Sequence, residues 1–383
     1  GRDMSLFLLT VFCIYGSVHV YAFCKAQAAF PLGIAPRVPL GLFLAAMTVS
    51  PVLVRLLERH SFDGMARSLS WVGYTWMGAL FIFFSVSLLT DALRLAARLA
   101  SVALRADAAW FVPSARQTFL LPLLLALCIS VYAYFEALHI RTETITVRSP
   151  KIPPAMGRIR IAQISDVHLG LIVREERLHR ILRVIRQADP DILVSTGDLM
   201  DGQIDSVSGL AEIFGSFTPR YGKFAVTGNH EFYAGLDHSL EVTRSAGFTV
   251  LRNEAAGAAG VVIAGVDDAT GERFGTRPPL SEHDLLARLS PDTFIVLLKH
   301  MPVVGDSSSG LFDLQLSGHT HRGQIFPFRF MVRPFFSYVS GSHALPAGSL
   351  LHVSRGTGTW GPPMRFLAPP EVTVIDLVHG TDK

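Results

Sequence analysis

The hydrophobic pattern divides the chain near residue 140. Before that point, four apolar runs of about 20 residues follow one another with little charge inside them. A helix needs about 20 apolar residues to cross a bilayer, and core helices of soluble domains rarely lack charge over that length. We therefore expect a transmembrane domain over residues 4–140, with helices at 6–23, 39–57, 69–89 and 119–138. The alternative is four buried helices of a soluble domain.

Cationic residues separate the third and fourth runs. Arg94, Arg98 and Arg105 recur at roughly helical spacing among Leu and Ala within residues 91–109. This pattern predicts either an amphipathic helix in the membrane interface or a plain continuation of the third helix. Positive charges nearly balance on the two sides of the four spans, so they leave the side of the C-terminal domain undetermined.

After residue 140 the pattern changes to short elements. Residues 141–157 contain three prolines and scattered charge, and we expect a linker that opens with an edge strand at 144–147. From residue 158, short apolar or alternating segments predict strands, and residues 175–188 form an amphipathic helical pattern. Strands are expected at 158–165, 191–196, 223–227, 260–265, 293–298, 313–316, 350–354 and 372–377. Strands that alternate with helices indicate an α/β domain over 158–383.

The composition excludes some classes of protein. The formal net charge of +3 is too small to imply a nucleic-acid partner. Three cysteines, all in or beside apolar runs, provide neither a disulfide framework nor a Cys-type zinc site.

Polar side chains suited to metal binding follow five predicted strands. They are Asp166 and His168, Asp198, Asn229 and His230, His300, and His319 and His321. In α/β sheets, sites form beyond the carboxyl ends of strands, so we expect these side chains to converge. Oxygen and nitrogen donors without sulfur suit Mn, Fe or Zn. A bridging carboxylate would allow two ions, which hold a hydroxide between them and clamp a phosphoryl group for in-line attack.

The chain resembles the calcineurin-like metallophosphoesterases over about residues 158–377. The motifs Asp-x-His, Gly-Asp, Gly-Asn-His-Glu, His and Gly-His-x-His occur in order. Fuller stretches at 164–170, 318–324 and 354–358, with Arg365-Phe366 and Pro370-Glu371, are similar to the membrane-associated bacterial branch. That branch includes YkuE-like phosphodiesterases and, more distantly, UDP-diacylglucosamine pyrophosphohydrolases. The resemblance implies a sandwich of two mixed sheets flanked by helices.

The resemblance also implies roles for these residues. Asp166, His168, Asp198 and His321 would hold one metal; Asp198 would bridge to a second, held with Asn229, His300 and His319. His230 would lie near the leaving group as an acid or charge stabiliser, and Asp201 would orient it.

One departure from the pattern of the family bears on the class of substrate. Gly202 directly follows Asp201, where the protein phosphatases of the superfamily have an arginine, which argues against phosphoprotein substrates. Arg322 or Arg355 could replace that arginine and bind the substrate; the alternative for each is an ordinary salt bridge.

Residues 325–338, called here the aromatic segment, follow the last histidine. They include Phe328 and Phe335 with interleaved arginines. Our hypothesis is an apolar wall at the mouth of the site that dips into the membrane interface and receives a lipid tail. The alternative is that these aromatics pack a core beneath the second sheet.

Together these features predict a multi-pass protein of the bacterial inner membrane with a dinuclear-metal phosphoesterase domain. The expected reaction is hydrolysis of a phosphodiester, pyrophosphate or phosphomonoester bond by a metal-bridging hydroxide, in a lipid-linked substrate. Manganese is the expected metal, with iron or zinc as alternatives. The alternatives in function are a tethered phosphodiesterase for soluble nucleotides or cell-wall phosphodiesters, and an inactive membrane scaffold or sensor. The lipid bilayer is the expected partner, with neither a nucleic-acid nor a protein partner.

Overall fold

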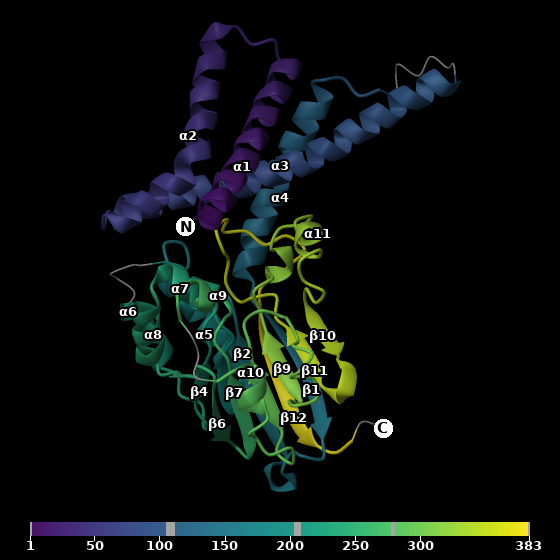
Figure 1. The fold of residues 1–383 in the computed structure, drawn as a ribbon. Helices are drawn as coiled ribbons and strands as arrows, with labels where there is room; N and C mark the ends of the chain where they lie inside the picture. Colours follow the sequence, from purple (N-terminus) through teal and green to yellow (C-terminus); the bar gives the residue numbers. More distant parts are fainter. Residues whose placement is uncertain (1, 105–111, 203–207, 277–279, 382–383) are drawn as a thin grey trace. The chain divides into compact units, whose positions relative to one another are not determined.

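The structure is a computed structural model that describes residues 2–104, 112–202, 208–276 and 280–381 (Figure 1). The chain forms two compact units. The helical unit comprises residues up to 134 with 361–364, and the sheet unit comprises 135–360 with the residues from 365 onward.

Four long helices follow one another at the N-terminus. They are α1 (Arg2–Ala29), α2 (Ile34–Arg59), α3 (Asp63–Leu104) and α4 (Gln117–Leu138). Among the described residues, α2, α3 and α4 are long and apolar enough to cross a membrane. The N-terminal apolar helices are therefore confirmed, with three candidate spans where four were expected. The remaining expected span, 6–23, lies in α1, whose first side chains are outside the described set.

The third helix is longer than its apolar run. α3 includes residues 91–104. Up to Leu104, therefore, the structure contains the plain continuation of the third helix and not a separate interfacial helix. Leu, Ala and Arg dominate this stretch, and all three are strong helix formers. Residues 105–109 of the expected amphipathic helix lie outside the described residues.

The sheet unit contains two mixed sheets of six strands, which confirms the expected fold class. The first sheet has the order β1 (Arg141–Ser149), β12 (Glu371–His379), β2 (Arg158–Ile164), β3 (Ile192–Ser195), β4 (Lys223–Ala225), β5 (Thr249–Val250). The second has the order β10 (Gly341–Ala344), β11 (Leu350–Val353), β9 (Leu314–Ser317), β8 (Ile295–Leu298), β7 (Val261–Gly265), β6 (Glu254–Ala258). Strands β2 to β5 are parallel to one another, as are β7, β8, β9 and β11.

The alternation of side chains along each strand builds two cores. In β8, Val296 and Leu298 face the core between the sheets, while Ile295 and Leu297 face the outer core beneath α10 (Glu282–Leu286). This is the period of two that a strand buried on both faces requires. The other helices are α5 (Glu175–Ala188), α6 (Ser208–Gly215), α7 (Asn229–Ala234), α8 (Leu236–Ser245), α9 (Thr270–Arg273) and α11 (Arg329–Val332).

The expected linker at 141–157 is the clearest difference from the sequence analysis. Residues 141–149 form β1, which pairs in parallel with β12 along its whole length, from Arg141 opposite Glu371 to Ser149 opposite His379. Ile145 and Val147 pack against the core between the sheets. The strand is longer than the expected 144–147 because its pairing partner supplies hydrogen bonds along all nine residues. The prolines come only after it.

Candidate metal centre

The expected metal-binding side chains come from loops at the carboxyl ends of strands in both sheets. Asp166 and His168 follow β2, Asp198 follows β3, and Asn229 and His230 begin α7 after β4. His300 follows β8, and His319 and His321 follow β9. Within each sheet these strands are parallel, so their carboxyl ends lie at one edge and the loops meet there.

The loops hold an unusual backbone conformation. Five of the residues have left-handed φ values: Asp166 (53°), His168 (54°), Asp198 (52°), His319 (71°) and His321 (47°). Left-handed backbone costs a non-glycine residue roughly 1–2 kcal/mol, and such strain concentrates at functional sites. Gly318 permits the close approach of two of these loops. A Cβ there would lie 1.9 Å from Ser165 Oγ and 2.3 Å from Asp166 Oδ2.

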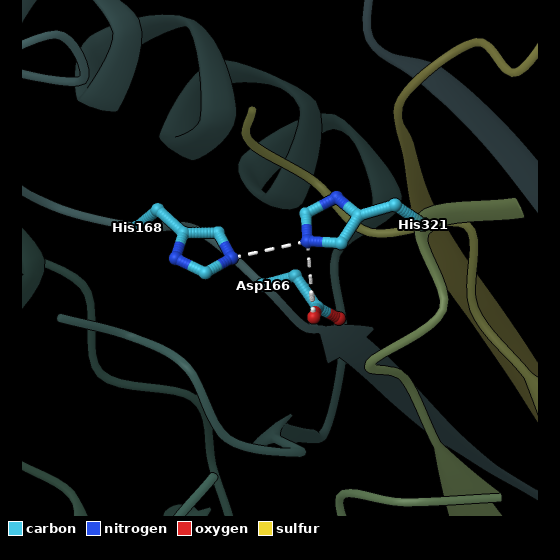
Figure 2. Close-up of side chains that lie close together, drawn as sticks. All are labelled: Asp166, His168 and His321. Atoms are coloured by element: carbon cyan, nitrogen blue, oxygen red, sulfur yellow. Dashed lines mark hydrogen bonds and ion pairs between the residues drawn. The ribbon is translucent and has the colours of Figure 1, made fainter. Parts of the chain in front are cut away.

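Asp166, His168 and His321 form the first cluster (Figure 2). The Nε2 atoms of His168 and His321 are 3.0 Å apart, and His321 Nε2 lies 3.3 Å from Asp166 Oδ1. The carboxylate of Asp166 is also positioned by the backbone, because the N–H of His319 donates to its two oxygens at 3.0 and 3.1 Å. All three side chains are almost fully buried.

Asp198, His300 and His319 form the second cluster. His300 Nε2 lies 3.2 Å from Asp198 Oδ2, 3.2 Å from Asn229 Oδ1 and 3.1 Å from His319 Nδ1. Asp198 Oδ2 is also 3.8 Å from His168 Nε2, in the first cluster. The carboxylate of Asp198 therefore lies between the two clusters, within 3.8 Å of a histidine from each.

The donor atoms fit divalent metal ions. In each cluster, imidazole nitrogens and carboxylate oxygens lie within 4.8 Å of one another. Burial lowers the pKa values of His319 and His321, assisted by His300 and Arg365 respectively, so both rings stay neutral, as ligands must. Burial opposes ionisation of Asp198, but His300 and His230 outweigh it and lower the pKa of this carboxyl well below its usual range. The chemistry is that of a metal site without sulfur.

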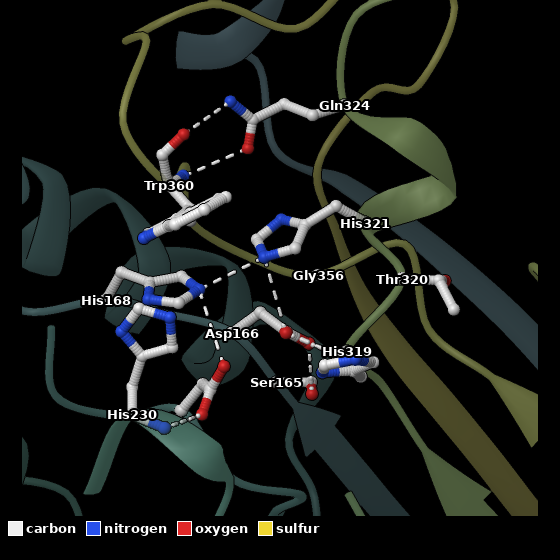
Figure 3. Close-up of polar contacts among 12 residues, drawn as sticks. Ser165, Asp166, His168, His230, His319, Thr320, His321, Gln324, Gly356 and Trp360 are labelled. Atoms are coloured by element: carbon white, nitrogen blue, oxygen red, sulfur yellow. Dashed lines mark hydrogen bonds and ion pairs between the residues drawn. The ribbon is translucent and has the colours of Figure 1, made fainter. Parts of the chain in front are cut away.

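His230 and Asp201 lie beside the first cluster (Figure 3 shows His230). His230 Nδ1 is 3.0 Å from Asp201 Oδ1, and the His230 ring centroid is 4.7 Å from that of His168. Burial disfavours the charged form of His230, but Asp198 and Asp201 raise its pKa to about 9. Burial likewise opposes ionisation of Asp201, but its interactions with His168 and His230 lower its pKa. The pair has the arrangement expected of an imidazole oriented by a carboxylate. His230 also lies close enough to His168 and Asp198 to form a third group of potential metal ligands.

Two supporting residues carry little signal in the sequence. Glu231 is buried and accepts four backbone N–H bonds, from Asp198, Leu199, Met200 and Gly228. It thereby joins the loops after β3 and β4. Arg365 is fully buried and donates to the carbonyl oxygens of Gly358, Arg355 and His321. Its partners lie 7, 10 and 44 residues away in the chain and form no local pattern with it, so only the resemblance drew attention to it.

The two arginines proposed as substrate contacts differ. Arg355 lies against the carboxylates of Glu371 and Glu143, which makes it part of an ion-pair network. The salt bridge named as the alternative is present, and substrate contact by Arg355 stays a prediction. Arg322 is partly buried, and burial together with Arg355 and Arg329 lowers its pKa. Arg322 thus sits in a locally cationic region directly after His321.

The aromatic segment remains largely outside the core. Phe328 is 42% exposed and Phe335 is 80% exposed, and α11 lies between them. Phe336 turns inward, with its ring centroid 5.0 Å from that of His319. The segment therefore connects a candidate metal ligand to an exposed apolar surface.

Comparisons with known proteins agree with the geometry. A family model described as calcineurin-like phosphoesterase matches residues 159–323. An uncharacterized metallophosphoesterase of Aquifex aeolicus is 40% identical over 255 residues, covering 66% of this chain and 97% of the relative. YkuE of Bacillus subtilis, also a metallophosphoesterase, is 32% identical and covers 64% of this chain and 87% of its own. A transmembrane protein with a metallophosphoesterase domain from Danio rerio is 30% identical, covering 98% of this chain and 89% of its own. That last alignment includes the helical unit.

Proposed function

Because this chain belongs to the calcineurin-like phosphoesterases, we propose that it hydrolyses a phosphodiester, pyrophosphate or phosphomonoester bond of a lipid-linked substrate with two metal ions. The coarser activity, metal-dependent hydrolysis of a phosphoric ester, follows from the family. The observation that carries the dinuclear proposal is the position of Asp198, whose Oδ2 lies 3.2 Å from His300 Nε2 and 3.8 Å from His168 Nε2.

The residues divide between the two metals as their clusters do. Asp166, His168 and His321 would hold one ion, Asn229, His300 and His319 the other, and Asp198 both. When bound, two such ions, which we propose are manganese, lower the pKa of water and withdraw charge from a phosphoryl group. His230, oriented by Asp201, would hold a proton at the leaving-group oxygen or stabilise the charge that develops there.

The lipid-linked substrate is supported by two features of the chain. The helical unit contains three candidate spans, whereas one span would suffice as an anchor. The aromatic segment offers exposed side chains, Phe330 and Met331 as well as Phe328 and Phe335, that an acyl chain could contact. We propose that the protein is a multi-pass protein of the bacterial inner membrane.

The first test compares substrates on detergent-purified protein loaded with manganese. Bis-p-nitrophenyl phosphate would be assayed beside a panel of lipid phosphates, pyrophosphates and phosphodiesters, with Asp198→Ala as the inactive control. We expect turnover of one lipid substrate that the control lacks. Hydrolysis of the small diester alone would indicate that the helices serve only as an anchor. It would favour a soluble nucleotide or a cell-wall phosphodiester as the substrate. Metal binding without any hydrolysis would favour the scaffold.

The second test concerns the aromatic segment. Phe328→Ser and Phe335→Ser should lower kcat/KM for the lipid substrate about tenfold or more, because each removes an apolar contact with the acyl chain worth roughly 1.5–3 kcal/mol. Hydrolysis of bis-p-nitrophenyl phosphate should change little. Equal losses on both substrates would contradict the lipid-contact role.

A further inference from the structure

A second aromatic surface lies on the other side of the candidate metal centre, around His230. Trp360 is 52% exposed, and its ring centroid is 5.6 Å from that of His230. Tyr233 is 48% exposed, with its centroid 5.5 Å from the same imidazole. Both rings stand nearly edge-on to His230, at 75° and 72°. Half of each large ring is therefore left to solvent beside the residue assigned to the leaving group.

Trp360 is fixed in place by one side chain. Gln324 donates from Nε2 to the Trp360 carbonyl oxygen at 2.8 Å, and Gln324 Oε1 accepts from the Trp360 N–H at 2.9 Å (Figure 3). This two-point contact joins the turn after His321 to the loop that carries Trp360. Gln324 has a left-handed φ of 54°, a conformation that costs energy in a residue of its kind. Both backbone polar groups of this exposed loop tryptophan are thus hydrogen-bonded to one side chain.

Exposed aromatic rings with fixed positions serve to bind other rings. Tryptophan loses little conformational freedom on binding because its backbone is already restrained, and ring stacking adds to the area that it buries. An exposed indole on a restrained backbone, beside the proposed leaving-group histidine, is therefore suited to the group that departs with the ester oxygen.

We propose that Trp360, assisted by Tyr233 and positioned by Gln324, binds a planar aromatic ring in the part of the substrate that lies beside His230. This inference rests on the proposed function for the placement of the leaving group, and it adds a specificity for aromatic rings, either a simple aryl group or a nucleobase. Trp360 and Tyr233 contact the substrate, whereas Gln324 is a positioning residue that acts through Trp360.

The test measures binding rather than turnover, so that its failure is distinguishable from failure of the proposed function. Isothermal titration calorimetry on the full-length, manganese-loaded protein in detergent would compare phenylphosphonate with cyclohexylphosphonate, neither of which can be hydrolysed. The two ligands match in size and charge and differ in aromaticity. Wild-type protein should bind the phenyl compound about threefold to tenfold more tightly, the range expected for one aromatic pair.

Variants then assign the preference to Trp360. Trp360→Leu should abolish it, Trp360→Phe should retain it, and Gln324→Glu, which loses the donation to the Trp360 carbonyl, should reduce it. Phe62→Leu is the matched control, because it removes an exposed aromatic (56% exposed) that belongs to the helical unit, and it should leave the preference unchanged. Equal binding of both ligands by wild-type protein, or an undiminished preference in Trp360→Leu, would overturn the proposal.

The 5′-methylenephosphonate analogue of uridine 5′-monophosphate and the corresponding analogue of ribose 5-phosphate, neither of which can be hydrolysed, separate the two sources of the ring. A further loss of affinity for the nucleotide alone in Trp360→Leu would identify a nucleobase site. Loss confined to the phenyl compound would identify a site for a simple aryl group. Loss of affinity for all four ligands in Trp360→Leu would show that Trp360 supports the metal centre instead, and would contradict a ring site.

Discussion

The two units of this protein treat polar side chains in opposite ways. In the helical unit, large apolar side chains such as Leu42 and Val131 are exposed. Lys25 and Asp91 form an ion pair at 2.6 Å, and Tyr21 donates a hydrogen bond to the same carboxylate. In the sheet unit, the carboxylates of Asp166 and Asp198 are buried and meet imidazoles. Burying a carboxylate costs several kcal/mol unless partners compensate it. At the candidate metal centre the sheet unit accepts that cost where the charges converge, and elsewhere it compensates buried carboxylates with structural partners, as Arg355 does for Glu371.

The strongest test of this contrast removes one buried charge without changing the shape of the side chain. Asp198→Asn should lower hydrolysis of bis-p-nitrophenyl phosphate by about a thousandfold or more, because under the proposed function a neutral amide cannot replace a carboxylate that two cations would share. Metal content, measured by mass spectrometry, should fall as well. Asp292→Asn changes an exposed carboxylate of the same unit and should be neutral. Wild-type rates in Asp198→Asn with full metal content would exclude the bridging role.

A smaller effect is expected where the sheet unit buries a cation for structural reasons. Lys223, in β4, donates from Nζ to the carbonyl oxygens of Phe214 at 2.9 Å and Ala246 at 2.6 Å, at the ends of α6 and α8. Helix C-termini attract cations and carry unpaired carbonyls. Lys223→Met keeps the apolar stem but leaves both oxygens unsatisfied, so the free energy of unfolding should fall by about 1–3 kcal/mol.

Thermal unfolding followed by circular dichroism would measure that loss. Lys151→Met is the matched control, since Lys151 pairs with Asp313 at 2.8 Å but remains about one-third exposed. Its loss should cost less than about 1 kcal/mol. Equal destabilisation in the two variants would mean that the two carbonyls at the helix ends do not depend on Lys223.

The residues of the candidate site were predictable because their signal is local. Each candidate ligand lies within a few residues of the end of a short buried strand, and Gly318 and Gly228 stand where a Cβ would collide with Asp166 or Asp198. The positions of these residues after the predicted strands therefore indicated that their side chains converge. The helical unit was predictable for another reason, since a long apolar run has few alternatives to a spanning helix.

What could not be predicted depends on partners distant in the chain. Residues 141–149 are mostly polar, with Ile145 and Val147 as their apolar residues, and only pairing with β12 makes them a strand of the first sheet. Arg355 showed no local sign of its pairing with Glu371 and Glu143. The contact between Gln324 and Trp360 likewise joins two loops whose meeting follows from the assembled sheets. Single-sequence patterns do not encode such pairs.

The smallest expected effect is a change in the thermal stability of the helical unit. Tyr21→Phe removes only the hydroxyl that donates to Asp91 Oδ2 at 2.6 Å, while Lys25 remains 2.6 Å from the other carboxylate oxygen. Side-chain hydrogen bonds between membrane helices average about 0.6 kcal/mol, because the unfolded helices find other partners in the membrane. Thermal unfolding in detergent should therefore shift by only a degree or two, with hydrolysis of bis-p-nitrophenyl phosphate unchanged. Lys25→Met should shift it further, since it leaves the Asp91 charge without its cation. A Tyr21→Phe loss as large as that of Lys25→Met would mean that the hydroxyl, and not the ion pair, holds α1 against α3.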